Sequence, residues 1–150
     1  MSKITEFMGR DHKRLDGIFN EFRRLKDRDL NKAGNLFSDF KTGLERHIVW
    51  EEEILFPAFE DRTGMYSSGP TAVMRMEHRQ IKEFLEEIQG RIQKQDLHTG
   101  EFEEALIRIL SQHDQKEEAV LYPWIDRSLS DGEREEILLK IKKSSPEKHE

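Results

Sequence analysis

Four histidines and two glutamates of this chain occupy matching positions in two similar stretches. Residues 8–15 recur as 74–81 and residues 47–57 recur as 113–123, and both displacements (74 − 8 and 113 − 47) are 66 residues. The chemically functional residues that recur in this way are His12, His47, Glu51, His78, His113 and Glu117. Imidazole nitrogens and carboxylate oxygens are common ligands of divalent transition metals. The duplicated pattern therefore predicts a site for two metal ions.

These residues lie on apolar stripes with the three-and-four spacing of amphipathic helices. The stripes predict helices over residues 4–25, 36–58, 74–92 and 102–121, separated by turn-forming residues at 27–34, 61–70 and 95–100. No segment alternates like a strand. Because short connections join antiparallel neighbours, the sequence predicts an all-α protein with an up-down-up-down four-helix bundle.

The end of the chain adds a short additional C-terminal helix to this bundle. Ser130 and Glu133 form a capping-box pattern, so the helix should begin at Ser130. Its apolar face should be formed by Ile137, Leu138 and Ile141. We expect one domain over residues 1–143, followed by a polar tail over residues 144–150.

The spacing also predicts that the four histidines lie at one level of the bundle. Antiparallel neighbours share a level when they lie equally far from their connecting turn, and the midpoints of successive histidines fall within or at the edge of the three predicted turns. Glu51 and Glu117 lie four residues beyond their histidines, which is about 6 Å along the axis at 1.5 Å per residue. They share the same helix face. Six donors should thus converge on one small volume.

Burial of these groups is costly unless a ligand compensates them. Two unpaired carboxylates in one cavity repel each other, and the stripes carry no Lys or Arg to neutralise them. A single histidine on an apolar stripe is more often a hydrogen-bonded core residue, but six donors at one level favour a metal site. Nitrogen and oxygen ligands without sulfur suit non-haem iron, with manganese or zinc as substitutes.

Composition narrows the possible classes of protein. The 150 residues include no cysteine, which excludes disulfides, thiolate nucleophiles and iron–sulfur clusters. The net charge of −6 argues against nucleic-acid and anionic-membrane partners. The first residues lack the apolar run of a signal peptide, and no stretch is long enough to span a membrane. We expect a cytoplasmic protein, and the sequence identifies no protein partner.

The ordered set of ligands resembles the hemerythrin-like (HHE cation-binding) family. That family has a histidine on the first helix, His-x-x-x-Glu on the second, a histidine on the third and His-x-x-x-Glu/Asp on the fourth. The matching residues here are His12, His47 with Glu51, His78, and His113 with Glu117, and the strings 51–57 and 117–123 add to the match. The resemblance implies two iron ions with an oxo or hydroxo bridge and with both glutamates bridging. It further implies that His12 and His47 serve one iron and that His78 and His113 serve the other.

One departure from the oxygen-carrying members bears on function. Those proteins have a fifth histidine one turn from the one on the third helix, whereas the positions around His78 are Met74 and Lys82. The four-His, two-Glu set is more similar to iron-centre repair proteins that respond to nitric oxide and to a hemerythrin-like iron sensor. The resemblance thus implies an open position on each iron and the binding or sensing of O2, NO or iron. The alternatives are a peroxidase-like or NO-reducing di-iron enzyme and a metal-free structural bundle.

Several neighbouring residues are candidates for the surroundings of the metals. Met8 and Met74 each precede a ligand histidine by one turn and are expected to fill space beside the site. Tyr122 could donate a hydrogen bond to a bound ligand, although plain packing is the favoured interpretation. The remaining glutamates beside the stripe are expected to be solvated, although one of them could orient a ligand histidine; they are Glu52, Glu53 and Glu118.

Overall fold

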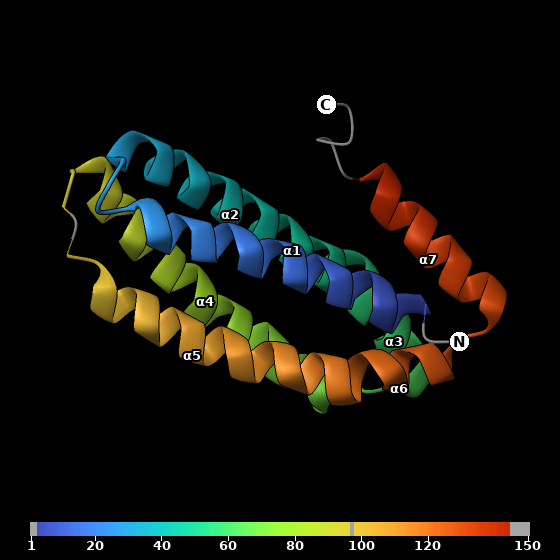
Figure 1. Ribbon diagram of the computed structural model, residues 1–150. Helices are drawn as coiled ribbons and strands as arrows, with labels where there is room; N and C mark the ends of the chain where they lie inside the picture. The colour runs from blue at the N-terminus through green and yellow to red at the C-terminus, as the bar shows by residue number, and fades with distance from the viewer. Residues whose placement is uncertain (1–2, 97, 145–150) are drawn as a thin grey trace.

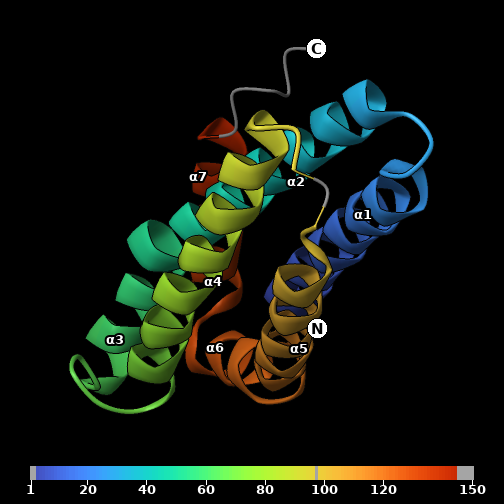
Figure 2. The same ribbon diagram turned by 90° about the vertical axis from the view of Figure 1, so that its left-hand side faces the viewer.

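A computed structural model describes residues 3–96 and 98–144, and it confirms the all-helical bundle with a C-terminal helix. No strand occurs among these residues. The elements are α1 (Lys3–Leu25), α2 (Leu30–Trp50), the π-helical turn η1 (Glu51–Leu55), α3 (Phe56–Thr63), α4 (Pro70–Gln93), α5 (Gly100–Lys116), the π-helical turn η2 (Glu117–Leu121), α6 (Tyr122–Ser128) and α7 (Asp131–Lys143). The turns α1–α2 and α4–α5 lie at one end of the bundle, and α7 packs beside the other end (Figures 1 and 2). Among the described residues, none of the helices combines the length and the apolar character needed to cross a bilayer.

The helix boundaries follow local capping chemistry. α2 begins at Leu30, inside the predicted break at 27–34, because the side chain of Asp29 accepts a hydrogen bond from the backbone of Lys32. α3 continues into the next predicted break and ends at Thr63, and it is capped by Gly64, whose φ of 79° suits glycine. α4 begins at Pro70, at the end of the predicted break. The predicted start at Ser130 is confirmed, and the capping box of Ser130 with Glu133 is present. Residues 145–150 of the predicted tail lie outside the described residues.

Two π-helical turns interrupt the second and fourth helical segments at the two repeated glutamates. The N–H of Phe56 donates to the carbonyl of Glu51, and the N–H of Tyr122 donates to that of Glu117, five residues back in both copies. A proline follows each turn and supplies no N–H. Such a turn takes up one more residue than an α-helical turn, and this rotates the chain beyond it. The sequence analysis did not predict these turns.

Two apolar clusters lie on either side of the histidine level. The first fills the end with the α1–α2 and α4–α5 turns and includes Phe22, Phe37 and Leu85. The second fills the end beside α7 and includes Phe59 and Ile141. The polar level between them is thus shielded from water along the bundle axis, which is the condition that a buried metal site requires.

Candidate metal centre

The six predicted ligands lie together in the middle of the bundle. They come from α1, α2, α4, α5 and the first residue of each π-helical turn, and their side chains are at most 4% exposed. Their donor atoms form two overlapping groups, in each of which every pair of atoms lies within 4.8 Å: His12, His47, Glu51 and Glu117 in one, and Glu51, His78, His113 and Glu117 in the other. The structure thus brings all six together at one level, while metal ligation by them stays a prediction.

Each glutamate directs one oxygen toward each group. Glu51 Oε2 lies 3.5 Å from His47 Nε2, and its Oε1 lies 2.9 Å from His78 Nε2. Glu117 Oε1 lies 3.2 Å from His12 Nε2, and its Oε2 lies 3.1 Å from His113 Nε2. Adjacent ligands of an octahedral ion with bonds of about 2.0–2.1 Å are roughly 3 Å apart. The donor set therefore fits two cations bridged by two carboxylates.

Three atoms of the site have no hydrogen-bond partner although they are fully buried: Glu51 Oε1, His78 Nε2 and Glu117 Oε2. The first two lie 2.9 Å apart, at ion-pair distance, but their orientation is not that of a hydrogen bond. Buried polar atoms rarely stay unsatisfied in native structures, because the loss of hydration costs about 1–3 kcal/mol for each group. A cation between these atoms would satisfy them, so the local geometry fits a metal independently of the sequence pattern.

A second ring of four carboxylates contacts the outer nitrogen, Nδ1, of each histidine. The pairs are Glu118 with His12 at 2.6 Å, Asp11 with His47 at 2.8 Å, Glu52 with His78 at 2.7 Å and Glu77 with His113 at 2.8 Å. In metal proteins this contact fixes the orientation and tautomer of the ring and raises the basicity of the ligating nitrogen. Every imidazole is therefore held with Nε2 toward the centre.

This second ring revises the sequence interpretation. Glu53 and Glu118 are exposed, as expected, whereas Glu52 is half-buried. Glu52 and Glu118 each contact a candidate ligand histidine, which agrees with the alternative that such a residue orients the ring. Asp11 and Glu77 were not predicted at all. A signal existed in the sequence, because both acids directly precede a histidine and are related by the same displacement of 66 residues.

Tyr122 packs in the second apolar cluster, as expected, and its hydroxyl also lies inside the site. Its side chain is fully buried, and its hydroxyl donates to Glu51 Oε2 and, at 2.8 Å, to Glu117 Oε1. The hydroxyl also lies 3.2 Å from His47 Nε2 and 3.3 Å from His12 Nε2. Burial, together with the two carboxylate charges, raises the pKa of Tyr122 well above its usual value.

Met8 and Met74 are buried in the second apolar cluster, beside the histidine level. This placement agrees with the expectation that both methionines fill space next to the site. Any influence of either thioether on a bound metal or ligand stays a prediction.

Without a metal, the imidazoles hold protons that balance the buried carboxylates. Burial lowers the pKa of His47, but the charge of Glu51 and the hydrogen bond to Asp11 outweigh it and raise the pKa to about 10. Burial also lowers the pKa of His113, but the charge of Glu117 and its hydrogen bond outweigh this effect and raise the pKa to about 10. A metal ion must displace these protons, so its binding is coupled to pH.

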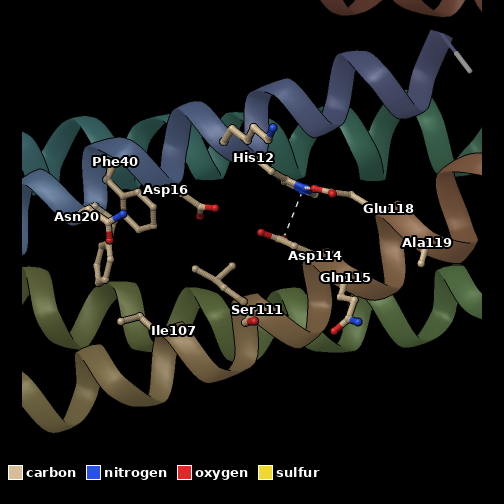
Figure 3. A pocket seen from close by; sticks show the side chains of 13 residues that line it. His12, Asp16, Asn20, Phe40, Ile107, Ser111, Asp114, Gln115, Glu118 and Ala119 are labelled. Carbon is tan, nitrogen blue, oxygen red and sulfur yellow. Dashed lines mark hydrogen bonds and ion pairs between the residues drawn. The ribbon is translucent and has the colours of Figure 1, made fainter.

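A groove of about 760 Å³ between α1 and α5 reaches the site at His12. Figure 3 shows Asp16 and Asp114 projecting into it from the two helices, with Asp114 Oδ1 3.3 Å from His12 Nε2. Burial raises the pKa of Asp114 to about 7. The equivalent positions in the other copy of the repeat hold Lys82 and Ile48, so the two copies differ on this side.

Comparisons with known proteins agree with this geometry. Residues 3–125 match the family described as the hemerythrin HHE cation binding domain. The chain is 28% identical over 133 residues to an uncharacterised hemerythrin-like protein of Schizosaccharomyces pombe. That alignment covers 89% of this chain and 64% of the relative, so the chain spans less than two thirds of the relative's length. No solved structure matches.

Proposed function

The chain belongs to the hemerythrin HHE cation-binding family, and on that basis we propose that it holds two iron ions and binds or senses a small ligand there. The ligand is O2, NO or iron itself. The proposed metal ligands are the six residues of the two donor groups, with Glu51 and Glu117 shared between the ions. The proposal rests mainly on the two glutamates, because each of them directs one carboxylate oxygen toward each donor group.

The chemistry of the donors favours iron. The site offers only imidazole nitrogens, carboxylate oxygens and a phenol oxygen, which suit non-haem iron and also accept manganese or zinc. A pair of iron ions supplies redox chemistry and positions that a diatomic ligand can occupy. Apolar clusters on both sides of the histidine level shield these positions from water along the bundle axis.

The absent fifth histidine favours sensing, repair or iron handling over oxygen carriage. The two positions one turn from His78 hold Met74, which is buried among apolar side chains, and Lys82. The groove beside His12 provides a route by which a small ligand reaches the centre from solvent. Acidic residues line it, and they attract a ferrous ion more readily than an anion.

Anaerobic reconstitution tests this proposal. The metal-free chain is titrated with ferrous iron, its metal content is measured, and optical spectra are recorded before and after a pulse of O2 or NO. We expect two iron ions per chain and a spectrum that NO changes. Glu51→Gln should lower the iron content, whereas Glu53→Gln, at an exposed neighbour, should not. A chain that binds no iron would contradict the proposal. An oxygen adduct that decays only over hours would contradict the preference for sensing, repair or iron handling over oxygen carriage.

The second candidate is a di-iron enzyme that reduces peroxide or NO, because the groove beside His12 would give such small substrates access to the centre from solvent. Sustained turnover of hydrogen peroxide or NO with an added reductant would support the enzyme. A metal-free structural bundle is less compatible with the three unsatisfied atoms of the site. A cytoplasmic location and the lack of a nucleic-acid partner stay predictions.

A further inference from the structure

The hydroxyl of Tyr122 is in contact with every donor atom of one metal position and with only that position. It lies 2.8 Å from Glu117 Oε1, 3.2 Å from His47 Nε2 and 3.3 Å from His12 Nε2, and it contacts Glu51 Oε2 directly. These four atoms are the inward-facing donors of the group that contains His12 and His47. Five potential ligands therefore surround this position.

These contacts are compatible with a phenol oxygen that binds the same ion as the other four donors. Neighbouring ligands of one octahedral ion with bonds of about 2.0–2.1 Å lie roughly 3 Å apart. The phenol oxygen lies at about this distance from His12, His47 and Glu117 and is closer to Glu51. It could therefore serve as a fifth protein ligand of an ion held there.

The second metal position lacks this donor. The residue equivalent to Tyr122 in the other copy of the repeat is Phe56, 66 residues earlier. Its ring stacks on the imidazole of His78, with centroids 5.9 Å apart and planes 7° apart, and it carries no ligand atom. The repeat is therefore symmetric in its histidines and glutamates but not at this position.

We propose that Tyr122 is a fifth protein ligand of the metal held by His12 and His47, so that the two ions of the centre are chemically different. One ion has two nitrogen and three oxygen ligands from the protein, and the other has two nitrogen and two oxygen ligands. The phenol proton is released to solvent when the metal binds, as happens for other protonated ligands. This inference rests on the proposed function, because it requires a metal at the centre.

The alternative is that Tyr122 only donates hydrogen bonds to the two bridging carboxylates. A phenolate bound to ferric iron absorbs visible light by charge transfer, whereas a phenol that is hydrogen-bonded to a carboxylate does not. The test is therefore spectroscopic. The chain is loaded with two ferrous ions and oxidised with ferricyanide, and its visible absorption and resonance Raman spectra are recorded.

We expect a charge-transfer band in the wild-type protein, with resonance-enhanced ring modes of tyrosinate. Tyr122→Phe installs the residue that the other copy carries, and it should abolish the band. Phe56→Tyr is the matched variant, because it offers a phenol to the second ion and should increase the band about twofold. A wild-type protein with two ferric ions and no such band would overturn the inference, and so would a band that survives in Tyr122→Phe.

Metal analysis separates this inference from the proposed function. Two iron ions without the band leave the proposed function intact and overturn only the role of Tyr122. A chain without iron overturns both. Circular dichroism shows whether Tyr122→Phe folds. If it does not, two results decide whether Tyr122 is a ligand: the tyrosinate ring modes of the wild type and the increase of the charge-transfer band in Phe56→Tyr.

Discussion

Each candidate imidazole is fixed from two sides, and this explains why four histidines can be buried together. On the inner side, Nε2 faces a glutamate that is shared by both metal positions. On the outer side, Nδ1 contacts one carboxylate of the second ring. Four imidazoles are thus matched by two inner and four outer carboxylates. Protonated imidazoles offset part of the carboxylate charge when metal is absent, and cations would offset it when metal is present.

The outer carboxylates should tune the affinity for metal without supplying ligands. Asp11→Asn and Glu77→Gln each weaken the contact with one histidine, and loss of such a contact typically lowers metal affinity about 10- to 100-fold. The measurement is competition with a chromophoric chelator. Asp39→Asn on α2 and Glu83→Gln on α4 are controls at exposed positions. Equal affinities in all four variants would show that the second ring does not act on the metal.

The stability of the metal-free protein should fall as the pH rises. The folded pKa values of His12, His47 and His113 are raised to about 9, 10 and 10, above the ordinary value of 6.5. Their protonated forms therefore stabilise the fold fully below about pH 6.5, and this contribution is lost as the pH rises through 9 and 10. Thermal melting between pH 6 and 10 measures the effect. A melting temperature that is constant over this range would contradict it.

Iron should change the sign of the pH effect. Bound imidazoles carry no proton on the ligating nitrogen, so acid competes with the metal and releases it. The iron-loaded protein should therefore gain stability relative to the metal-free protein as the pH rises from 6 to 9. Parallel melts with and without iron provide the comparison.

The two π-helical turns connect the site to the second apolar cluster. Each begins at a shared glutamate and is followed by a buried aromatic residue, Phe56 or Tyr122. The extra residue in the turn sets the rotation of the chain beyond it. In this way Tyr122 faces the centre, while helices α3 and α6 bury their aromatic faces under α7.

Deletion of Glu53, an exposed residue of η1, should destabilise the protein strongly. Leu55, Phe56 and Phe59 are fully buried in the core. The deletion would convert the π-helical turn into an α-helical turn, which would rotate these three side chains out of the core. The expected loss is about 3 kcal/mol or more, the size of truncating a large core residue. Urea denaturation measures it, and Glu53→Ala is the control that keeps the length. Equal stability of the two variants would show that the π-helical turn has no structural role.

The N-cap of the C-terminal helix α7 allows a prediction of a smaller loss of stability. Ser130→Ala removes the side-chain acceptor for the backbone of Glu133 and should cost about 1 kcal/mol. The same denaturation experiment detects this loss. Iron content should not change, because α7 supplies no candidate ligand.

The molecule as a whole is a duplicated pair of helical hairpins around one shared centre. Each half supplies two histidines and one glutamate, and each glutamate belongs to both donor groups. Neither half can complete a metal position alone. Metal binding should therefore stabilise the packing of the two halves against each other, and hence the folded state.

Removal of the metal should lower the melting temperature while the helices persist. A metal at 100 times its dissociation constant stabilises the folded state by about 2.7 kcal/mol. For a domain of this size that corresponds to roughly 5–10 °C in melting temperature. Circular dichroism melts with and without a chelator measure the shift, and zinc is a redox-inactive comparison. An unchanged melting temperature would argue against metal binding in the folded state.

The sequence by itself determined the helices, their order and the level of the six donors. Apolar periodicity and short turns leave few arrangements for four amphipathic helices, and equal distances from a turn place residues such as His12 and His47 side by side. What only the tertiary structure decided is the direction of individual side chains. The roles of Tyr122, Asp11 and Glu77 depend on the rotation of each helix about its axis and on the extra residue in each π-helical turn. Those rotations are set by packing between residues far apart in the chain, which local patterns do not record.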